Sequence, residues 1–216
     1  MRIAIIGTGR MATGLGKGWL KAGHFVAFGS RRPESKNEFH ASVGTESRIY
    51  GFEGAITAGE VVVLAIPYSE VAAFAKKYAH LLRGKVIVDI SNPIGRQPPD
   101  GRAGAELTAE TIGERARVLA AFKDNFATTL EAPVDHTGEP RDVHFAGDDD
   151  EAKQVLAGLV RDLGFRPVDC GPLRHAVMLD HLVPLMVHLD RTVNGGRATS
   201  SFRFAAPSFT PSAASR

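Results

Sequence analysis

The chain has 216 residues, of which 44% are hydrophobic and 23% are charged, and its net charge is +2, from 26 Lys and Arg against 24 Asp and Glu. This composition excludes a wholly disordered chain, a collagen and a small disulfide scaffold. The length suits one domain, or one domain with a small appendage. The near balance of charges gives no reason to expect a nucleic-acid partner.

Cysteine usage and the N-terminus indicate the compartment. Cys170 is the single cysteine, so no disulfide can form within the chain, and a reducing compartment fits. The N-terminus has one early Arg and only four consecutive apolar residues, Ile3–Ile6, which is unlike a signal peptide. Since no apolar run approaches the roughly 18 residues of a membrane helix, we expect a cytoplasmic protein with no membrane partner.

The first two-thirds of the chain alternates short apolar runs with segments of helical spacing. In chain order we expect a strand at Arg2–Ile6, a helix at Arg10–Ala22, a strand at Phe25–Gly29, a helix at Pro33–Val43, a strand at Arg48–Tyr50, a short helix at Ala55–Ala58, a strand at Val61–Ile66, a helix at Ser69–Leu82, and strands at Val86–Ile90 and Val118–Phe122. Strands that alternate with helices predict a parallel sheet with right-handed crossovers.

The last third continues this pattern after a loop rich in Pro, Gly and Arg at Asn92–Gly104. Here we expect a strand at Asp142–Ala146, a helix that starts at Asp148–Asp150 and stops at Gly164, a strand at Arg166–Asp169 and an apolar helix at Leu173–Val193 with a kink at Pro184. Residues 195–216 predict an irregular tail, in which Phe202, Phe204 and Phe209 suggest docking onto the rest of the protein.

The strongest chemical signal is Gly7-Thr8-Gly9-Arg10-Met11-Ala12, which follows a strand and opens a helix. This is the context of a dinucleotide fingerprint, in which the first glycine allows a tight turn and the second lets the backbone approach a pyrophosphate. Ala12 stands in place of the third glycine and permits close helix–strand packing. The pyrophosphate would rest on the helix N-terminal amides. The alternative is a purely structural glycine turn.

The end of the second strand predicts which dinucleotide is bound. An NAD site has an acidic residue about 20 residues after the fingerprint, whereas this chain has Ser30, Arg31 and Arg32, with Lys36 nearby. Arginine binds phosphate through two parallel hydrogen bonds, so these residues favour the 2′-phosphate of NADP. The alternative is a solvated basic start of a helix.

Two further segments follow buried strands, at the sheet edge where ligands bind in open α/β folds. Ile66 and Pro67 follow one strand, and Asn92 and Pro93 follow the next. We expect these loops to flank a nicotinamide, although ordinary strand-to-loop punctuation would look the same. The expected fold class is therefore α/β, a Rossmann-like doubly wound and mainly parallel sheet with a small helical C-terminal segment.

Residues for acid–base, nucleophilic or metal chemistry are poorly represented. The spacing of His175, His181 and His188 does not match a compact metal site, and we expect surface or pocket-lining side chains. Cys170 follows an apolar strand and is expected to be a small core or edge residue. We assign no catalytic residue and no metal ligand. Hydride transfer between two bound redox cofactors needs none, because the protein then supplies orientation and exclusion of water.

The chain resembles the coenzyme F420-dependent NADP oxidoreductases and their dinucleotide-binding relatives. The resemblance covers most of residues 1–190, through GTGRMATGLGKG, GSRRPES, VVVLAIPY, VIVDISNP and the more distinctive FAGDDDEAKQVLAGLVRDLGFRPVDCGPL. It implies direct hydride transfer between NADP(H) and a deazaflavin, coenzyme F420. It also implies a C-terminal helix that contributes to the deazaflavin cleft and to a homodimer interface.

Carried over to this sequence, the resemblance implies a role for each motif. Thr8–Met11 would hold the pyrophosphate, Ser30 and Arg31 with Arg32 the 2′-phosphate, Ile66, Pro67 and the loop after Ile90 the nicotinamide, and Ala127 the meeting point of the two cofactors. The implied organisation is an NADP-binding domain at 1–140, a small α/β segment with the cleft and dimer helix at 141–194, and the tail at 195–216.

The chain departs from the archaeal members of this family between Ala121 and His136, where Lys123 stands in place of a histidine. Three functions therefore remain open. The first is hydride transfer between NADPH and F420. The second is NADPH-dependent reduction of a flavin, a metal chelate or a small carbonyl or imine compound, which Lys123 and His136 could polarise. The third is a non-catalytic NADP(H)-binding module.

Overall fold

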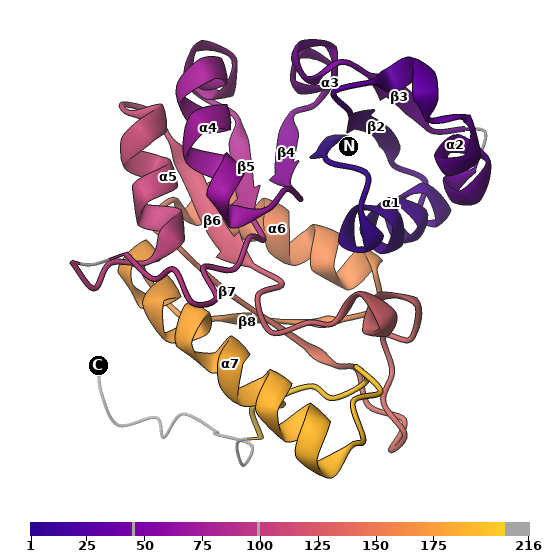
Figure 1. The fold of residues 1–216 in the computed structure, drawn as a ribbon, viewed down its shortest axis with the longest axis vertical. Coiled ribbons are helices and arrows are strands. Elements are labelled where there is room, and N and C mark those ends of the chain that lie inside the picture. The colour runs from indigo at the N-terminus through magenta and orange to yellow at the C-terminus, as the bar shows by residue number, and fades with distance from the viewer. Residues whose placement is uncertain (45, 99, 206–216) are drawn as a thin grey trace, which may run out of the picture.

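The computed structural model describes residues 1–44, 46–98 and 100–205, and a single eight-stranded sheet runs through it (Figure 1). The strand order is β3-β2-β1-β4-β5-β6-β7-β8. The strands are β1 (Arg2–Ile6), β2 (Phe25–Gly29), β3 (Arg48–Tyr50), β4 (Val61–Leu64), β5 (Val86–Asp89), β6 (Arg117–Ala121), β7 (Asp142–Gly147) and β8 (Arg166–Asp169). Every neighbouring pair is parallel except β6 and β7, which are antiparallel.

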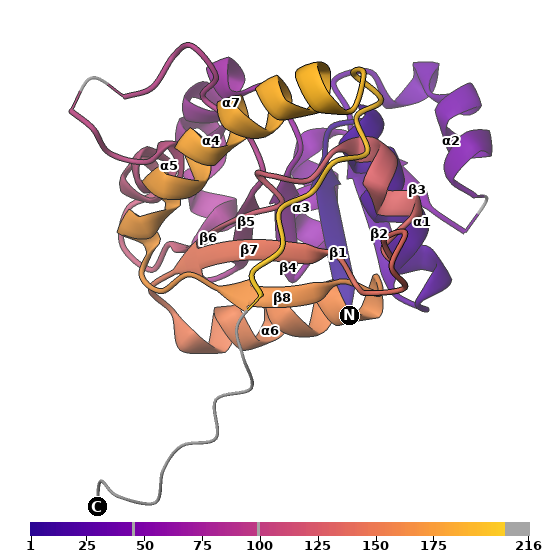
Figure 2. The same cartoon turned by 90° about the horizontal axis from the view of Figure 1, so that it is seen from below.

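Helices cover both faces of the sheet. They are α1 (Arg10–Lys21), α2 (Asn37–Val43), α3 (Phe52–Ala58), α4 (Tyr68–Leu82), α5 (Gly104–Ile112), α6 (Asp150–Asp162) and α7 (Ala176–Val193), with 3₁₀ turns at Pro33–Ser35, Ala127–Glu131 and Leu173–His175. One hydrophobic cluster joins the sheet to α1, α2 and α6, and a second joins it to α3, α4, α5 and α7. Figure 2 shows α6 and α7 on opposite sides of β7 and β8.

The central strands explain this two-sided packing. All four residues of β4, Val61–Leu64, are buried, and alternate residues of β1 point to opposite clusters, Ile3 to the α1 side and Ala4 to the α3 side. The indole of Trp19 in α1 donates a hydrogen bond to Leu159 O in α6 at 2.9 Å, which joins early and late parts of the chain. The predicted doubly wound, mainly parallel α/β fold is confirmed.

Several predicted bounds are corrected. The single helix expected at Pro33–Val43 is two pieces, because the backbone at Lys36 leaves the helical region. Helix α5 was not predicted. Its start is stabilised by the Glu106 carboxylate, which accepts from Ala103 N at 2.8 Å. Three of its four buried residues, Gly104, Ala105 and Thr108, are small or polar, so they form no apolar helical pattern. The C-terminal helix begins at Ala176, after the 3₁₀ turn, and includes Pro184.

The aspartates before α6 act as predicted at the helix start. The side chain of Asp149 accepts a hydrogen bond from Ala152 N at 2.7 Å, so it is the N-cap. Gly164 follows the helix with φ +83°, a conformation that glycine adopts readily.

The described part of the tail, 195–205, is irregular as predicted, and it docks through polar contacts. Asp190 accepts hydrogen bonds from Ala198 N and from the Ser200 hydroxyl, and Asp142 accepts one from Phe204 N at 2.7 Å. Of the phenylalanines expected to dock, Phe202 is half-buried and Phe204 is 61% exposed. Phe209 lies outside the described residues.

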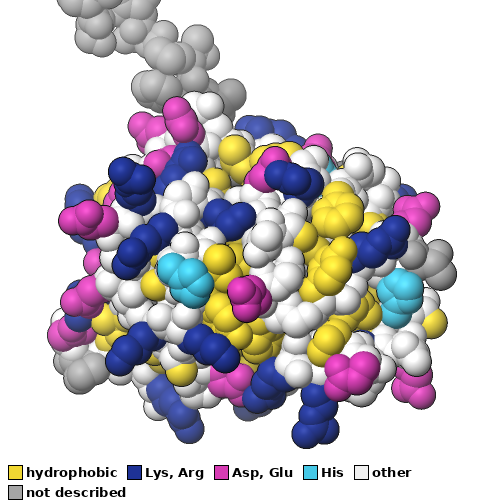
Figure 3. All heavy atoms as spheres, turned by 90° about the horizontal axis from the view of Figure 1, so that it is seen from above, with side chains coloured by type: hydrophobic (Ala, Val, Ile, Leu, Met, Phe, Trp, Pro, Cys, Tyr) yellow, Lys and Arg dark blue, Asp and Glu magenta, His cyan; other side chains and the backbone are white. Residues whose placement is uncertain are grey.

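The implied boundary near residue 140 precedes β7, which joins the same sheet as the preceding strands. The division into 1–140, 141–194 and 195–216 stays a prediction. No helix in the described part of the chain is both long and apolar enough to span a membrane. On the face drawn in Figure 3, Lys and Arg side chains are separated by acidic, apolar and other groups.

Candidate functional site

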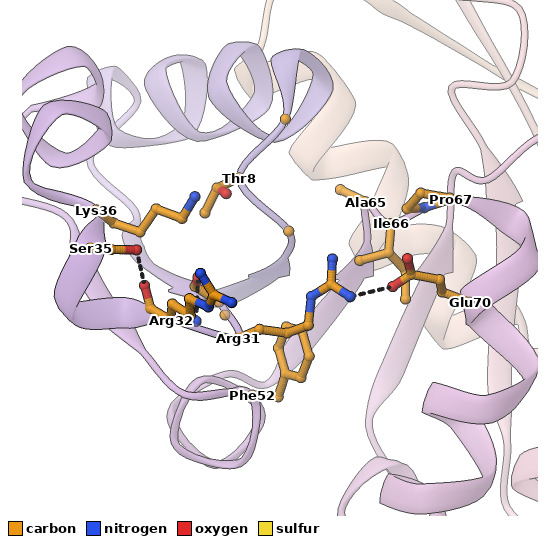
Figure 4. Close-up of a pocket in the computed structure, with 14 residues that line it drawn as sticks. Thr8, Arg31, Arg32, Ser35, Lys36, Phe52, Ala65, Ile66, Pro67 and Glu70 are labelled. Atoms are coloured by element: carbon orange, nitrogen blue, oxygen red, sulfur yellow. Dashed lines mark hydrogen bonds and ion pairs between the residues drawn. The ribbon is translucent and has the colours of Figure 1, made fainter.

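An open cleft of about 660 Å³ lies where the strand order reverses, at the carboxyl ends of β1, β2 and β4 (Figure 4). Ligands of doubly wound folds bind at this switch point. The lining residues are Gly7, Thr8, Gly9, Gly29, Ser30, Arg31, Arg32, Ser35, Lys36, Phe52, Ala65, Ile66, Pro67 and Glu70. Nine of the residues predicted from the sequence are therefore brought together in one cleft.

The glycine at the end of β1 is required by the fold itself. Gly7 has φ +123°, and a Cβ there would lie 2.3 Å from Ala65 O, which belongs to the segment after β4. Gly7 N also donates to Gly29 O at 2.9 Å. Any side chain at position 7 would therefore push two neighbouring strand ends apart.

The second glycine of the fingerprint has a different role. Gly9 has an ordinary extended backbone, with φ −84°, and a Cβ added there would have no atom within 4 Å. Gly9 is also the N-cap of α1 and supplies no side-chain cap, and the first turn of α1 holds no acidic residue. The backbone amides of Arg10 and Met11 have no carbonyl partner within the helix. The space left beside Gly9 and these amides fits a phosphate group.

Basic side chains gather at the β2 end of the cleft. In Figure 4 the Arg32 guanidinium and the Lys36 ammonium point into the cleft, toward Thr8. Ser30 is buried, and its hydroxyl oxygen accepts a hydrogen bond from Arg32 N at 3.1 Å, which fixes the turn. Among the described ion pairs, none involves Arg32 or Lys36. These two cations are therefore available to an anionic ligand.

Arg31 is held differently from the sequence prediction. Its guanidinium lies 3.6 Å from the Glu70 carboxylate of α4, and the Arg31 side chain is 74% exposed. The turn Gly29–Arg32 has no carboxylate of its own, as the sequence shows, and Glu70 approaches it from another element of the fold. Its only sequence signal is a place in the first turn of the helix after β4. An exposed pair of this kind contributes about 0–1 kcal/mol, so a phosphate can replace Glu70 as the partner of Arg31.

The residues expected near the nicotinamide divide into two groups. Ile66 and Pro67 line the cleft, whereas Asn92 and Pro93 lie beyond its lining, after β5. Ala127 begins the 3₁₀ turn Ala127–Glu131, which contacts α1, and it does not line the cleft either. The Asn92 side-chain amide donates to Lys123 O at 3.0 Å, while its Oδ1 is buried without a hydrogen-bond partner among the described residues.

Lys123 is not placed to polarise a substrate. It is 1% exposed, and its ammonium lies 3.1 Å from Asp180 Oδ1 and donates to Ser91 O. His136 is exposed in the turn between the 3₁₀ segment and β7. The sequence reasoning identified Lys123 as unusual but could not find Asp180, which lies 57 positions later in α7.

Two further groups keep their protons at neutral pH. Partial burial, followed by the charges of Asp180 and Asp89, raises the pKa of the Tyr68 phenol. Burial, followed by the charge of Asp124, raises the pKa of the Cys170 thiol. Cys170 packs against the second hydrophobic cluster, as expected of an edge residue of the core, and its environment disfavours the reactive thiolate.

The chain is similar to F420-dependent NADP reductases and, over part of their length, to metalloreductases. A family described as NADP oxidoreductase, coenzyme F420-dependent, matches residues 2–93. The F420-dependent NADP reductase of Methanocaldococcus jannaschii is 31% identical, over 88% of this chain and 92% of that protein. The metalloreductase STEAP3 of Rattus norvegicus is 29% identical over 81% of this chain but only 35% of its own length. The crystal structure of a candidate F420-dependent NADP-reductase from an Arthrobacter species has a TM-score of 0.84 at 25% identity, over 95% of this chain and all of that one.

Substitution of the two fingerprint glycines should affect different properties, stability at Gly7 and NADPH affinity at Gly9. Gly7→Ala should lower stability by about 1–3 kcal/mol through backbone strain, and Tm by about 2–10 °C. Gly9→Ala should leave Tm unchanged and weaken NADPH binding at least tenfold, because its methyl group occupies the space beside the amides. Thermal unfolding and calorimetric titration measure both effects. Native NADPH affinity in Gly9→Ala would contradict the assignment of this space.

The basic end of the cleft predicts discrimination between the two nicotinamide dinucleotides. Arg32→Ala should weaken NADPH binding about ten- to a hundredfold, since a charged hydrogen bond is worth about 1.5–3 kcal/mol. NADH binding should change little, because NADH has no 2′-phosphate. Lys21→Ala, which removes an exposed cation at the far end of α1, is the control for net charge. Equal losses for both dinucleotides in Arg32→Ala would place the 2′-phosphate elsewhere.

Proposed function

This chain belongs to the family of coenzyme F420-dependent NADP oxidoreductases, and we propose that it transfers a hydride between NADP(H) and the deazaflavin coenzyme F420. The protein is an NADP-linked oxidoreductase. The main observation behind the proposal is the open space beside Gly9 in the cleft. A Cβ atom at position 9 would contact no other residue, so the glycine is not required by packing, and its absence of a side chain leaves room for a phosphate. Family membership supports F420 as the second cofactor.

The residues of the cleft fit a bound NADP(H) from end to end. The first-turn amides of α1 would hold the pyrophosphate, and Arg32 and Lys36, with Ser30, would hold the 2′-phosphate. Arg31 would join them once it exchanges Glu70 for phosphate. Ile66 and Pro67 would border the nicotinamide, and proline limits the backbone freedom of that wall.

The chemistry that the two cofactors supply is direct hydride transfer, which needs no acid or base from the protein. The task of the chain is to place the two rings in contact and to exclude water. We place the deazaflavin side near Ala127 and α7, as the family resemblance implies. The buried segment from Phe122 to Asn125, after β6, would form the floor between the two cofactors.

The proposed reaction predicts a simple optical result. Purified protein with F420 and NADPH should remove the absorbance of the oxidised deazaflavin, while NADH at the same concentration should give at least tenfold less activity. Arg32→Ala should reduce the ratio of the NADPH-dependent rate to the NADH-dependent rate, because it lowers the rate with NADPH and not the rate with NADH. If the protein binds NADPH but the absorbance of oxidised F420 does not fall, the nucleotide site is supported and the deazaflavin is rejected as the hydride acceptor.

A second candidate is supported by the similarity to a metalloreductase over 81% of this chain. In this function NADPH would reduce a flavin or a metal chelate that occupies the position proposed above for F420. The chain spans only about a third of that relative's length. NADPH oxidation with a free flavin or a ferric chelate, but not with F420, would favour this candidate.

We also propose that α7 packs against a second copy of the chain. One side of the helix is buried over the sheet, through residues such as Leu179, Val183 and Met186. The other side exposes four large apolar residues, at Met178, Leu185, Leu189 and Val193. Their spacing of seven, four and four residues forms one stripe along the helix, which is typical of a helix that packs on both sides.

The exposed stripe predicts the oligomeric state. The wild-type chain should be a dimer by light scattering after size exclusion, and Leu185→Glu should shift it to the monomer, because a charge at the centre of the stripe opposes its burial. Val134→Glu changes an equally exposed apolar residue elsewhere and should leave the mass unchanged. A wild-type monomer would contradict the proposal.

A further inference from the structure

A buried cluster of one ammonium and two carboxylates joins three segments near the carboxyl end of β5. This strand pairs with β4, which is followed by the cleft residues Ile66 and Pro67. Lys123 follows β6, and its ammonium lies 3.1 Å from Asp180 Oδ1 in α7 and 4.0 Å from Asp89 Oδ1 at the end of β5. All three side chains are at most 2% exposed. The ammonium also donates to Ser91 O, in the loop that leads to Asn92.

Both carboxylates hold further groups in place. Asp89 accepts hydrogen bonds from Ser91 N at 2.9 Å and from the Thr108 hydroxyl of α5 at 2.8 Å. Asp180 accepts one from Gly104 N at 2.9 Å. The network therefore connects the loop after β5, the start of α5 and the middle of α7. A buried charge that loses its partner is strongly disfavoured, so this arrangement resists displacement of any member.

The backbone of the same segment controls the side chain of Asn92. Lys123 O accepts from the Asn92 amide nitrogen at 3.0 Å, so Asn92 Oδ1 is left as a buried acceptor without a partner among the described residues. Phe122, just before Lys123, has φ +55°, which an aromatic residue adopts only where its surroundings impose it. The contacts of Lys123 with Asp180, Asp89 and Ser91 fix the residue that follows Phe122 and so help to impose this backbone conformation.

We propose that Lys123 and Asp180 are positioning residues, which hold Asn92 Oδ1 ready to accept a hydrogen bond from the carboxamide of a bound nicotinamide. The proposal rests on the proposed NADP(H) site. Lys123 and Asp180 act through Asn92 and do not touch the nucleotide. A buried acceptor without a protein donor is disfavoured in the free protein, and the carboxamide NH₂ group supplies the missing donor.

The test compares NADPH with 2′,5′-ADP, which has the 2′-phosphate but no nicotinamide. Lys123→Met retains an unbranched side chain of similar length and removes its charge. It should weaken NADPH binding about three- to tenfold, the equivalent of one neutral hydrogen bond, and leave the affinity for 2′,5′-ADP unchanged. Asn92→Ala should have the same selective effect. The double variant should be no weaker than Asn92→Ala alone, because the two residues act in series.

Arg166→Met is the matched control for breaking an ion pair. Arg166 in β8 binds Asp142 at the start of β7 through two contacts of 2.6 and 2.7 Å, and neither residue belongs to the network of Lys123, Asp89 and Asp180. Its loss should lower Tm and leave both affinities unchanged. If Lys123→Met does not fold, Asp180→Asn takes its place, since it keeps an acceptor for Gly104 N and removes the charge that orients Lys123. The same selective loss of NADPH affinity is expected.

The outcomes separate this inference from the proposed function. Equal losses of NADPH and 2′,5′-ADP affinity, an unchanged NADPH affinity, or additive losses in the double variant would overturn the positioning role. Failure of the wild-type protein to bind 2′,5′-ADP would overturn the nucleotide site and this inference together. If the variants lose affinity for NADPH but not for 2′,5′-ADP, and the wild-type protein does not reduce F420, the positioning role is supported and only F420 is rejected as the acceptor.

Discussion

The close approach between the ends of β1 and β4 is the constraint on which the site depends. At Gly7 the chain passes so near to Ala65 O that a single added carbon would lie 2.3 Å from it. This contact lets β1 turn sharply into α1 while β4 runs beside it in the same sheet. The first turn of α1 then points at the space between the two strand ends. The cleft is therefore a consequence of backbone geometry before any side chain contributes to it.

The sheet beyond this point gives the cleft a rigid base. Both hydrophobic clusters extend from the N-terminal strands to the C-terminal elements, and Trp19 links α1 directly to α6. Movement of α1 relative to the rest of the sheet would expose both the indole and its buried hydrogen bond. Because of this packing, the position of the α1 amides is set by the whole chain and not by the fingerprint loop alone.

The part of the site that the sequence predicted best is the phosphate-binding part, because its residues lie close together in the chain. The fingerprint and the basic turn after β2 each depend on neighbours in the chain, and Gly7, Gly9 and Arg32 lie where those signals predict. Glu70 and Asp180 were missed because their roles depend on contacts across the fold, with Arg31 and Lys123. Helix α5 was missed for a related reason, since much of its burial comes from α4 and α7, which the local pattern does not show.

The two ends of the proposed nucleotide site use charge in opposite ways. At the phosphate end, Arg32 is exposed and Lys36 is half-buried, and neither has an ion-pair partner among the described residues, so the guanidinium and the ammonium both remain hydrated until an anion replaces the water. At the nicotinamide end, Lys123 is buried and already neutralised by carboxylates. An exposed cation can attract a phosphate, whereas a buried and paired one can only hold other groups in place. In the proposed site, the cations of Arg32 and Lys36 would therefore supply affinity for phosphate, whereas the cation of Lys123 would hold its neighbours in position.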